Sequence, residues 1–264
     1  MLPPSEGKTA PQTGPALDLE GLSFPALTRH RVKVAKTLAT VSKRRSALEV
    51  LGVGASLGAE VARNTELFAA PCAPAAKVYS GVLYDAAGMG TWDAAAIARA
   101  SGSVVTVSAL WGVVSPADLI PAYRLSMDTD LPGIGRLAPW WKPQLAKALA
   151  TRAESELIVD CRSSAYLAAW TPPASAEHVT VTVVRERAGK RSVVSHMAKH
   201  TRGVLAGFLA LGDAAPANPE DLAHSATALT MPGLGSAGVA AVELESRKAA
   251  GKAKAYVLTL VVRD

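Results

Sequence analysis

The first quarter of the chain is dominated by residues that favour helices, with apolar side chains recurring every three or four positions. This spacing predicts helices over residues 25–51 and 56–70. Residues 1–15 are rich in Pro, Gly and Ser and have no apolar period, so we expect a loop there, with at most a short strand before Pro3.

Runs of β-branched and apolar residues alternate with helix-like segments in the middle of the chain. The runs predict buried strands, and the helix formers between them predict helices. The expected strands are residues 77–83, 103–114 and 156–161, and the expected helices are residues 91–100 and 139–151. An alternation of this kind is typical of a sheet covered by helices.

The last third of the chain has the pattern of two β-hairpins separated by two helices. The expected elements are strands at 178–186 and 191–196, a helix at 198–211, and strands at 239–245 and 256–262. A further helix begins at Asn218, because an N-cap side chain, a proline and two acidic residues follow one another there. All the elements together predict a single compact α+β or mixed α/β domain over residues 1–264.

The composition excludes several classes of protein. Of 264 residues, 49% are hydrophobic, which excludes a disordered chain, and two cysteines cannot build a disulfide scaffold. The 28 Lys and Arg outnumber the 22 Asp and Glu, giving a net charge of +6 that favours anionic partners such as nucleic acid or nucleotides. With no long apolar run and no secretory signal in residues 1–15, we expect a cytoplasmic protein that does not enter a membrane.

Several short segments partly match known binding motifs. Gly7-Lys8-Thr9 resembles the end of a phosphate-binding P-loop, but Leu2 occupies the position of its first glycine. His196 and His200 have the spacing of two metal ligands on a helix, but the glutamate of the zinc-protease motif is missing, so we expect no metal. No cofactor motif is complete, and we expect no cofactor.

Two turns and one basic stretch allow a nucleic-acid interpretation beside a plain structural one. Residues 131–135 and 231–235 have the Pro-Gly pattern of a helix-hairpin-helix, yet ordinary turns explain them better because no helix is predicted before the first. The seven Lys and Arg of residues 29–45 form either a solvated helix face or a surface that follows phosphates.

Cations and hydroxyl groups recur where predicted strands end. The examples are Tyr123-Arg124, the segment from Arg162 to Tyr166, and the segment from His196 to Gly203. Because strand ends of an α/β sheet meet at one edge, these groups predict a cleft that binds an anion.

Five segments follow one another in the order and spacing of a known family, the YaaA peroxide stress proteins. They are PPSEGKT (3–9), KVYSGVLYDA (77–86), SALWGVVSPADLIPAYRLSM (108–127), IVDCRSSAY (158–166) and VVSHMAKHTRG (193–203). The third contains the specific block Leu110, Gly112, Pro116, Asp118, Leu119, Tyr123, Arg124, Leu125 and Met127. The chain therefore resembles this family over nearly its whole length.

The resemblance implies a mixed sheet with helices around a basic cleft, double-stranded DNA binding with a helix-hairpin-helix, and a cytoplasmic role in peroxide stress that limits free iron. It places three family motifs at Ser5–Thr9, Tyr79–Gly81 and Ala198–Gly203. The chain departs from the family in having only Met1 and Leu2 before Pro3, and His200 in place of a lysine. Cys161 replaces an expected leucine, and we expect it to be buried and inert.

Two functions follow from these residues. The first is binding of double-stranded DNA, with phosphate contacts from Lys8, Thr9, Tyr79, Ser80, Arg124, Arg162, Lys199 and Arg202. The alternative is an enzyme acting on a nucleotide or other phosphorylated small molecule in the same cleft, because duplex binding does not require the tyrosine and serines. Its candidate catalytic residues are Tyr79, Lys8 and Ser164.

Overall fold

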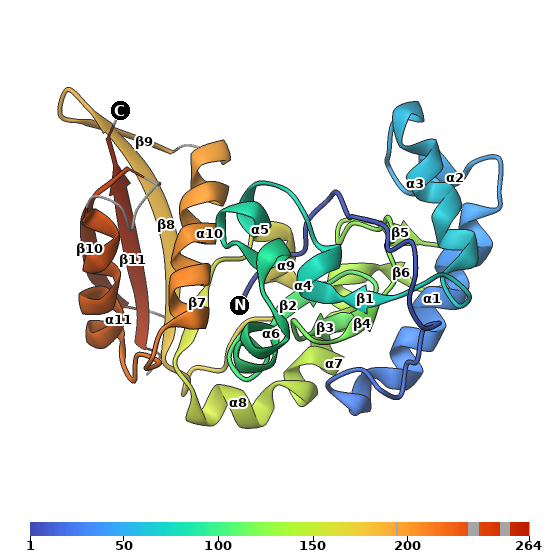
Figure 1. The fold of residues 1–264 in the computed structure, drawn as a ribbon, viewed down its shortest axis with the longest axis horizontal. Coiled ribbons are helices and arrows are strands. Elements are labelled where there is room, and N and C mark those ends of the chain that lie inside the picture. Colours follow the sequence, from blue (N-terminus) through green and yellow to red (C-terminus); the bar gives the residue numbers. More distant parts are fainter. Residues whose placement is uncertain (194, 232–237, 249–253, 264) are drawn as a thin grey trace.

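The largest sheet lies in the C-terminal half of the chain (Figure 1). The computed structural model describes residues 1–193, 195–231, 238–248 and 254–263. The strand order is β10-β11-β8-β7, with β9 paired to β8 beyond the end of β7. Their bounds are β7 Ile158–Asp160, β8 His178–Arg187, β9 Lys190–Val193, β10 Val239–Lys248 and β11 Lys254–Val262. Strand β8 runs parallel to β7 and β11 and antiparallel to β9, which confirms the predicted mixed sheet.

Three short antiparallel pairs complete the strands. They are β1 (Ala73–Pro74) with β4 (Leu119–Ile120), β2 (Thr106–Ser108) with β3 (Gly112–Val114), and β5 (Asp130–Leu131) with β6 (Gly135–Arg136). Residues 1 and 2 join the second pair to the large sheet. The Leu2 amide donates to the Val105 carbonyl at 2.9 Å, and the Cys161 amide donates to the Met1 carbonyl at 2.9 Å. The short strand expected before Pro3 is thus a two-residue link between β2 and β7.

Helices surround these strands in the described part of the chain. They are α1 Thr28–Ser42, α2 Ala47–Val50, α3 Gly58–Arg63, α4 Ala75–Val78, α5 Val82–Ala86, α6 Ala94–Ala100, α7 Leu137–Ala148, α8 Ala150–Ser155, α9 Ser164–Ala169, α10 Ser195–Leu211 and α11 Pro219–Ala226. Single 3₁₀ turns lie at Pro25–Leu27, Ala55–Leu57, Asn64–Glu66, Met89–Thr91 and Thr227–Thr230.

Helix α10 lies between the large sheet and α5 (Figure 1). Close approach is possible because α10 presents glycine at the contact. A Cβ on Gly203 would lie 2.1 Å from the Leu83 carbonyl oxygen, and one on Gly207 would lie 2.6 Å from the Ala87 oxygen. This packing fixes α5, and with it the segment Tyr79–Gly81 that precedes the helix.

Two strand predictions were wrong. Residues 77–83 form the end of α4 and the start of α5 instead of a strand, with Gly81 at a φ of 94° between them. Residues 103–114 form the β2–β3 hairpin instead of one strand. Gly112 follows the turn of this hairpin with a φ of 73°, which favours glycine. Its Cα packs against the Trp141 ring so closely that a Cβ at this position would lie 2.8 Å from the ring.

The C-terminal elements agree with the sequence except at one boundary, because β9 ends at Val193 and α10 begins at Ser195, within the strand predicted over residues 191–196. The β8–β9 and β10–β11 hairpins are present, and Ala188 and Gly189, with φ of 49° and 74°, form the first turn. Asn218 caps α11, its side chain accepting from the Asp221 amide at 2.8 Å.

The two Pro-Gly turns have different outcomes. Residues 131–135 join β5 to β6, so the first turn is part of a β-hairpin, and its first arm is not the helix that a helix-hairpin-helix requires. Residues 232–237 of the second turn lie outside the described residues.

Candidate functional site

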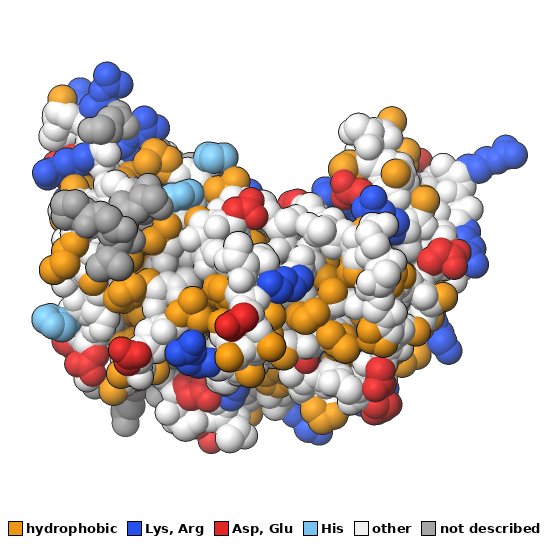
Figure 2. Space-filling view, viewed as in Figure 1, with side chains coloured by type: hydrophobic (Ala, Val, Ile, Leu, Met, Phe, Trp, Pro, Cys, Tyr) orange, Lys and Arg blue, Asp and Glu red, His pale blue; other side chains and the backbone are white. Residues whose placement is uncertain are grey.

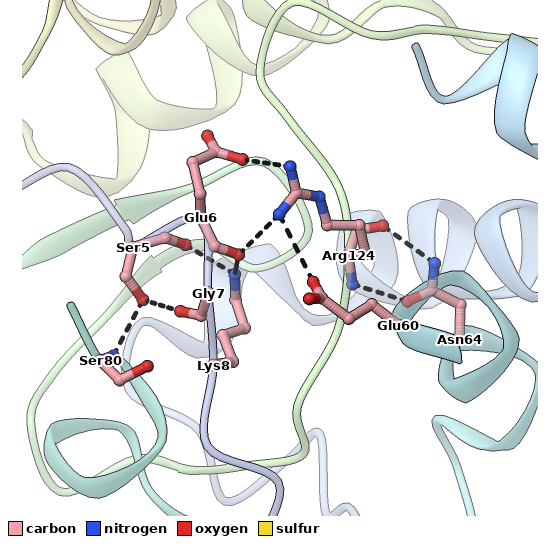
Figure 3. Close-up of polar contacts among 8 residues, drawn as sticks. All are labelled: Ser5, Glu6, Gly7, Lys8, Glu60, Asn64, Ser80 and Arg124. Carbon is pink, nitrogen blue, oxygen red and sulfur yellow. Dashed lines mark hydrogen bonds and ion pairs between the residues drawn. The ribbon is translucent and has the colours of Figure 1, made fainter. Parts of the chain in front are cut away.

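The N-terminal loop from Ser5 to Thr9 lies against two distant segments of the chain. The Thr9 amide donates to the Val78 carbonyl at 2.8 Å, Lys8 pairs with Tyr79 as an isolated antiparallel bridge, and the Ser80 amide donates to Ser5 Oγ at 3.1 Å (Figure 3). Ser5 in turn donates to the Gly7 carbonyl. These bonds fix the loop, which sequence patterns left without structure.

The amine of Lys8 is enclosed by backbone carbonyls and aromatic rings. Its Nζ donates to the Ser5 carbonyl at 2.7 Å and to the Glu6 carbonyl at 3.4 Å, and it lies 4.1 Å from the centre of the Tyr123 ring. No carboxylate in the described part of the chain forms an ion pair with it. Burial lowers the pKa of Lys8 from 10.5 to about 7. The Glu6 carboxylate raises this pKa and the Arg124 guanidinium lowers it, so the effects of these two charges oppose each other.

A chain of buried hydroxyl groups lies beside this amine. Tyr79 and Tyr123 share a hydrogen bond of 3.0 Å, and Tyr123 and Ser108 share one of 2.7 Å. Ser108 Oγ also accepts a hydrogen bond from the backbone amide of Trp111 at 3.0 Å. This bond fixes the Ser108 hydroxyl group, the last of the three, at the β2–β3 turn. Burial raises the pKa of Tyr79 to about 12, so its hydroxyl group stays protonated at neutral pH.

Arg124 ties the loop to the body of the protein. Its guanidinium lies 3.1 Å from Glu6 Oε2 and 3.4 Å from Glu60 Oε2 (Figure 3). Asn64 holds its backbone on both sides, accepting from the Arg124 amide at 2.8 Å and donating to the Arg124 carbonyl at 2.9 Å. The predicted anion-binding arginine therefore already has two carboxylate partners, and the cluster with Lys8 carries as many acidic as basic groups.

Comparison with known proteins identifies the family. Residues 1–228 match the family model described as peroxide stress protein YaaA. The chain belongs to the YaaA peroxide stress protein family. A UPF0246 protein of Streptomyces coelicolor is 42% identical over 227 residues, covering 85% of this chain and 87% of that protein. A UPF0246 protein of Corynebacterium efficiens is 42% identical over 214 residues, covering 80% and 84%. One from Corynebacterium glutamicum is 38% identical over 232 residues, covering 86% and 91%.

In this YaaA family member, two of the three family motifs come together. The loop Ser5–Thr9 and the segment Tyr79–Gly81 form the cluster described above, with Arg124 from the long central motif. Thr9 is exposed at the edge of the loop. The third motif lies on α10, where Lys199 is exposed and the Arg202 guanidinium donates to the Val181 carbonyl at 2.7 Å.

Two other predicted residues, Arg162 and Ser164, make no hydrogen bond to the cluster in the part of the chain that the structure describes. Arg162 is completely buried and hydrogen-bonds to Asp160 at 2.8 and 2.6 Å, so its charge is balanced inside the protein. Ser164 is exposed at the first position of α9. Cys161 is buried, as expected, and burial raises the pKa of its thiol.

The cluster around Lys8 and Arg124 contains two partners that the sequence analysis did not predict, Glu60 and Asn64. Both lie about sixty positions before Arg124 in the chain, and no motif in the sequence marks them as its partners. Across the described ranges, no group of three or more His, Cys, Asp or Glu is placed to hold a metal ion. No helix among the same residues has the length and apolar character needed to cross a membrane.

Proposed function

We propose that this family member is a cytoplasmic peroxide-stress protein that binds double-stranded DNA and limits free iron indirectly. The proposal draws on the shape of the surface. Figure 2 shows it hollowed between the end that carries β8 and β9 and the end that carries α2 and α3, with Lys and Arg at both ends. The effect on iron is indirect because the described residues offer no cluster of ligands for it.

The observation that carries the proposal is the division of charge between the two faces of the β8–β9 ribbon. Arg187 pairs with Lys190, and Glu186 pairs with Arg191, so each pair lies on its own face. Arg191 is bound to Glu243 at 2.7 Å, which ties its face to the sheet. Arg187 and Lys190 are exposed and have no acidic partner in the part of the chain that the structure describes.

A ribbon of this kind suits a DNA duplex. The major groove, about 12 Å wide, admits a two-stranded β-ribbon, and unpaired cations on its outer face meet phosphates. In the segment between α1 and α2, Lys43, Arg44 and Arg45 are exposed. Arg31 of the same basic stretch is buried and donates to the Trp111 carbonyl at 2.9 Å, so it holds the fold instead.

We expect the double variant Arg187→Ala/Lys190→Ala to weaken duplex binding and to reduce its dependence on salt. Losing two phosphate contacts lowers the slope of log K against log salt by about 2. Fluorescence anisotropy of a labelled duplex over a salt series measures this slope. The matched control is the double variant Lys142→Ala/Lys147→Ala, which removes the same number of positive charges. Both residues lie on α7, on the side of the protein opposite the hollow (Figure 1).

A third variant, Lys8→Ala/Arg124→Ala, decides whether the cluster itself takes part. A reduced slope there assigns the cluster to the DNA surface, and a slope equal to the wild type leaves it to a small ligand. If the wild type binds no duplex at low salt, DNA binding is abandoned. Equal binding by the ribbon variant and its α7 control removes the ribbon from the interface.

A second function, an enzyme acting on a nucleotide or other phosphorylated small molecule, is favoured by the cluster at Lys8. A half-buried amine beside the hydroxyl groups of Tyr79 and Tyr123 is typical of a ligand site, and duplex binding does not need it. We expect a nucleotide or sugar phosphate to raise the melting temperature of the wild type but not of Lys8→Ala. A ligand at 100 times its Kd contributes about 2.7 kcal/mol. Absence of any stabilising compound in a broad thermal-shift screen argues against this function.

A further inference from the structure

A cavity of about 150 Å³ lies where the start of the chain meets the large sheet, α8 and the end of α10. The buried part of its wall is apolar and includes Leu2, Cys161, Trp170 and Leu205. None of the described residues that line it belongs to the cluster around Lys8 and Arg124. The cavity is therefore a site of its own, separate from the cluster.

The lining of the cavity suits an apolar occupant better than water. A buried water molecule needs roughly two to four polar partners, whereas the buried side chains of this wall are almost all hydrocarbon. The Cys161 thiol is uncharged at neutral pH, because burial raises its pKa. A dry cavity of this volume accommodates a molecule of about the size of benzene.

The mouth of the cavity carries an ion pair that is neutral as a whole. Arg152 is half-buried and Glu156 is exposed, and both line the cavity. Arg152 Nη2 lies 2.7 Å from Glu156 Oε2, and its Nε donates to the two carboxylate oxygens at 3.0 and 2.8 Å. Nη2 also donates to the Gly102 carbonyl at 2.9 Å, which fixes the guanidinium.

This arrangement leaves one donor group at the mouth for a ligand. Arg152 Nη1 forms no hydrogen bond to any residue that the structure describes. A neutral oxygen can accept from Nη1 without disturbing the ion pair. A carboxylate in the same place would lie beside that of Glu156, which already balances the charge of Arg152.

We propose that this cavity binds a small uncharged molecule with a cyclic apolar body of about the size of benzene and one hydroxyl or carbonyl oxygen. The apolar body packs against the buried wall, and the oxygen accepts a hydrogen bond from Arg152 Nη1 at the mouth. The site goes beyond both proposed functions and depends on neither of them.

Occupation of the cavity stabilises the folded chain. Met1 and Leu2 form part of the wall, and their backbone bonds to Cys161 and Val105 link β7 to β2. These wall residues come together only on folding, so a ligand that packs on them binds the folded state and raises the melting temperature.

Fluorine NMR with the intact protein tests the proposal. The probes are para-fluorobenzyl alcohol, which is uncharged, and para-fluorobenzoate, which has the same ring and a negative charge. We expect the wild type to bind the alcohol at least about tenfold more tightly than the benzoate, because an anion at the mouth has no free counter-ion. We also expect the alcohol to raise the melting temperature.

Two variants place the probe in the cavity. Ala206→Leu fills the wall from α10 and is expected to abolish binding of the alcohol, whereas Ala150→Leu adds the same group at an exposed position of α8 outside the lining and is expected to bind as the wild type does. Glu156→Gln leaves Arg152 without its counter-ion, so we expect the preference for the alcohol over the benzoate to fall by about tenfold.

Three results would overturn the proposal. They are absence of binding by the wild type, equal binding of the two probes, and binding of the alcohol by folded Ala206→Leu at the affinity of Ala150→Leu. Should Ala206→Leu fail to fold, Glu156→Gln decides the matter, because its substitution lies at an exposed position. An unchanged preference in that variant means that the probe does not bind beside Arg152 and overturns the proposal.

Discussion

Replacing Asp160 with alanine is expected to lower the free energy of unfolding by about 3–5 kcal/mol, because the variant leaves a buried guanidinium without its partner. The side chains of Asp160 and Arg162 are both fully buried, and the carboxylate accepts from Arg162 Nε at 2.8 Å and from its terminal nitrogen at 2.6 Å. His178 adds a contact of 3.1 Å. Urea denaturation at neutral pH measures the change.

The matched control removes both charges in the variant Asp160→Leu/Arg162→Met. Replacing a whole buried pair with apolar side chains is often close to neutral, so we expect this variant to be more stable than Asp160→Ala. If the single and double variants are equally destabilised, the loss comes from packing at the end of β7 and the unpaired charge is not its cause.

The same pair predicts a loss of stability in acid. Burial alone would raise the pKa of Asp160, but hydrogen bonds from Arg162 and His178 outweigh burial and hold it well below its usual range. A carboxyl group with a lowered folded pKa stabilises the protein above the unfolded pKa, about 3.9, and this contribution disappears as the pH falls through the folded pKa. The double variant lacks this contribution and is expected to lose less stability between pH 5 and pH 2.

The elements that local sequence patterns predicted correctly are those with strong local signals. Asn218 with Pro219 determined the start of α11, and Ala188-Gly189 determined a tight hairpin turn. The predicted strand at residues 77–83 failed because its apolar residues fill core positions from two short helices, α4 and α5. Val78 and Leu83 are buried there, and α5 is held by its contact with α10, which is more than a hundred residues away in the chain.

The candidate site was only partly predictable for a related reason. Family motifs pointed to Lys8, Tyr79 and Arg124, and the structure brings these three together. The balance of charge at the site could not be predicted from the motifs, because the carboxylate of Glu60, on a helix distant in the sequence, forms an ion pair with Arg124. Arg162 had the same appearance as Arg124 in the sequence, but the acid two positions before it, Asp160, holds its side chain inside the protein.

The second large effect concerns Lys8, and its sign follows from the direction of the pKa shift. Burial lowers the folded pKa to about 7, so the unfolded chain binds more protons than the folded protein between pH 7 and about 10.4. Stability due to this residue therefore rises with pH across that window, and below pH 7 the folded protein bears the cost of a buried charge. We expect Lys8→Met to remove this dependence.

The expected change is roughly 3 kcal/mol in the difference between wild type and Lys8→Met from pH 6 to pH 10. This is less than the ~5 kcal/mol of the whole shift, because solvent reaches the half-buried loop and screens the charge. Urea denaturation at pH 6, 8 and 10 provides the values, and Lys77→Met serves as control. A difference that stays constant with pH contradicts the shift.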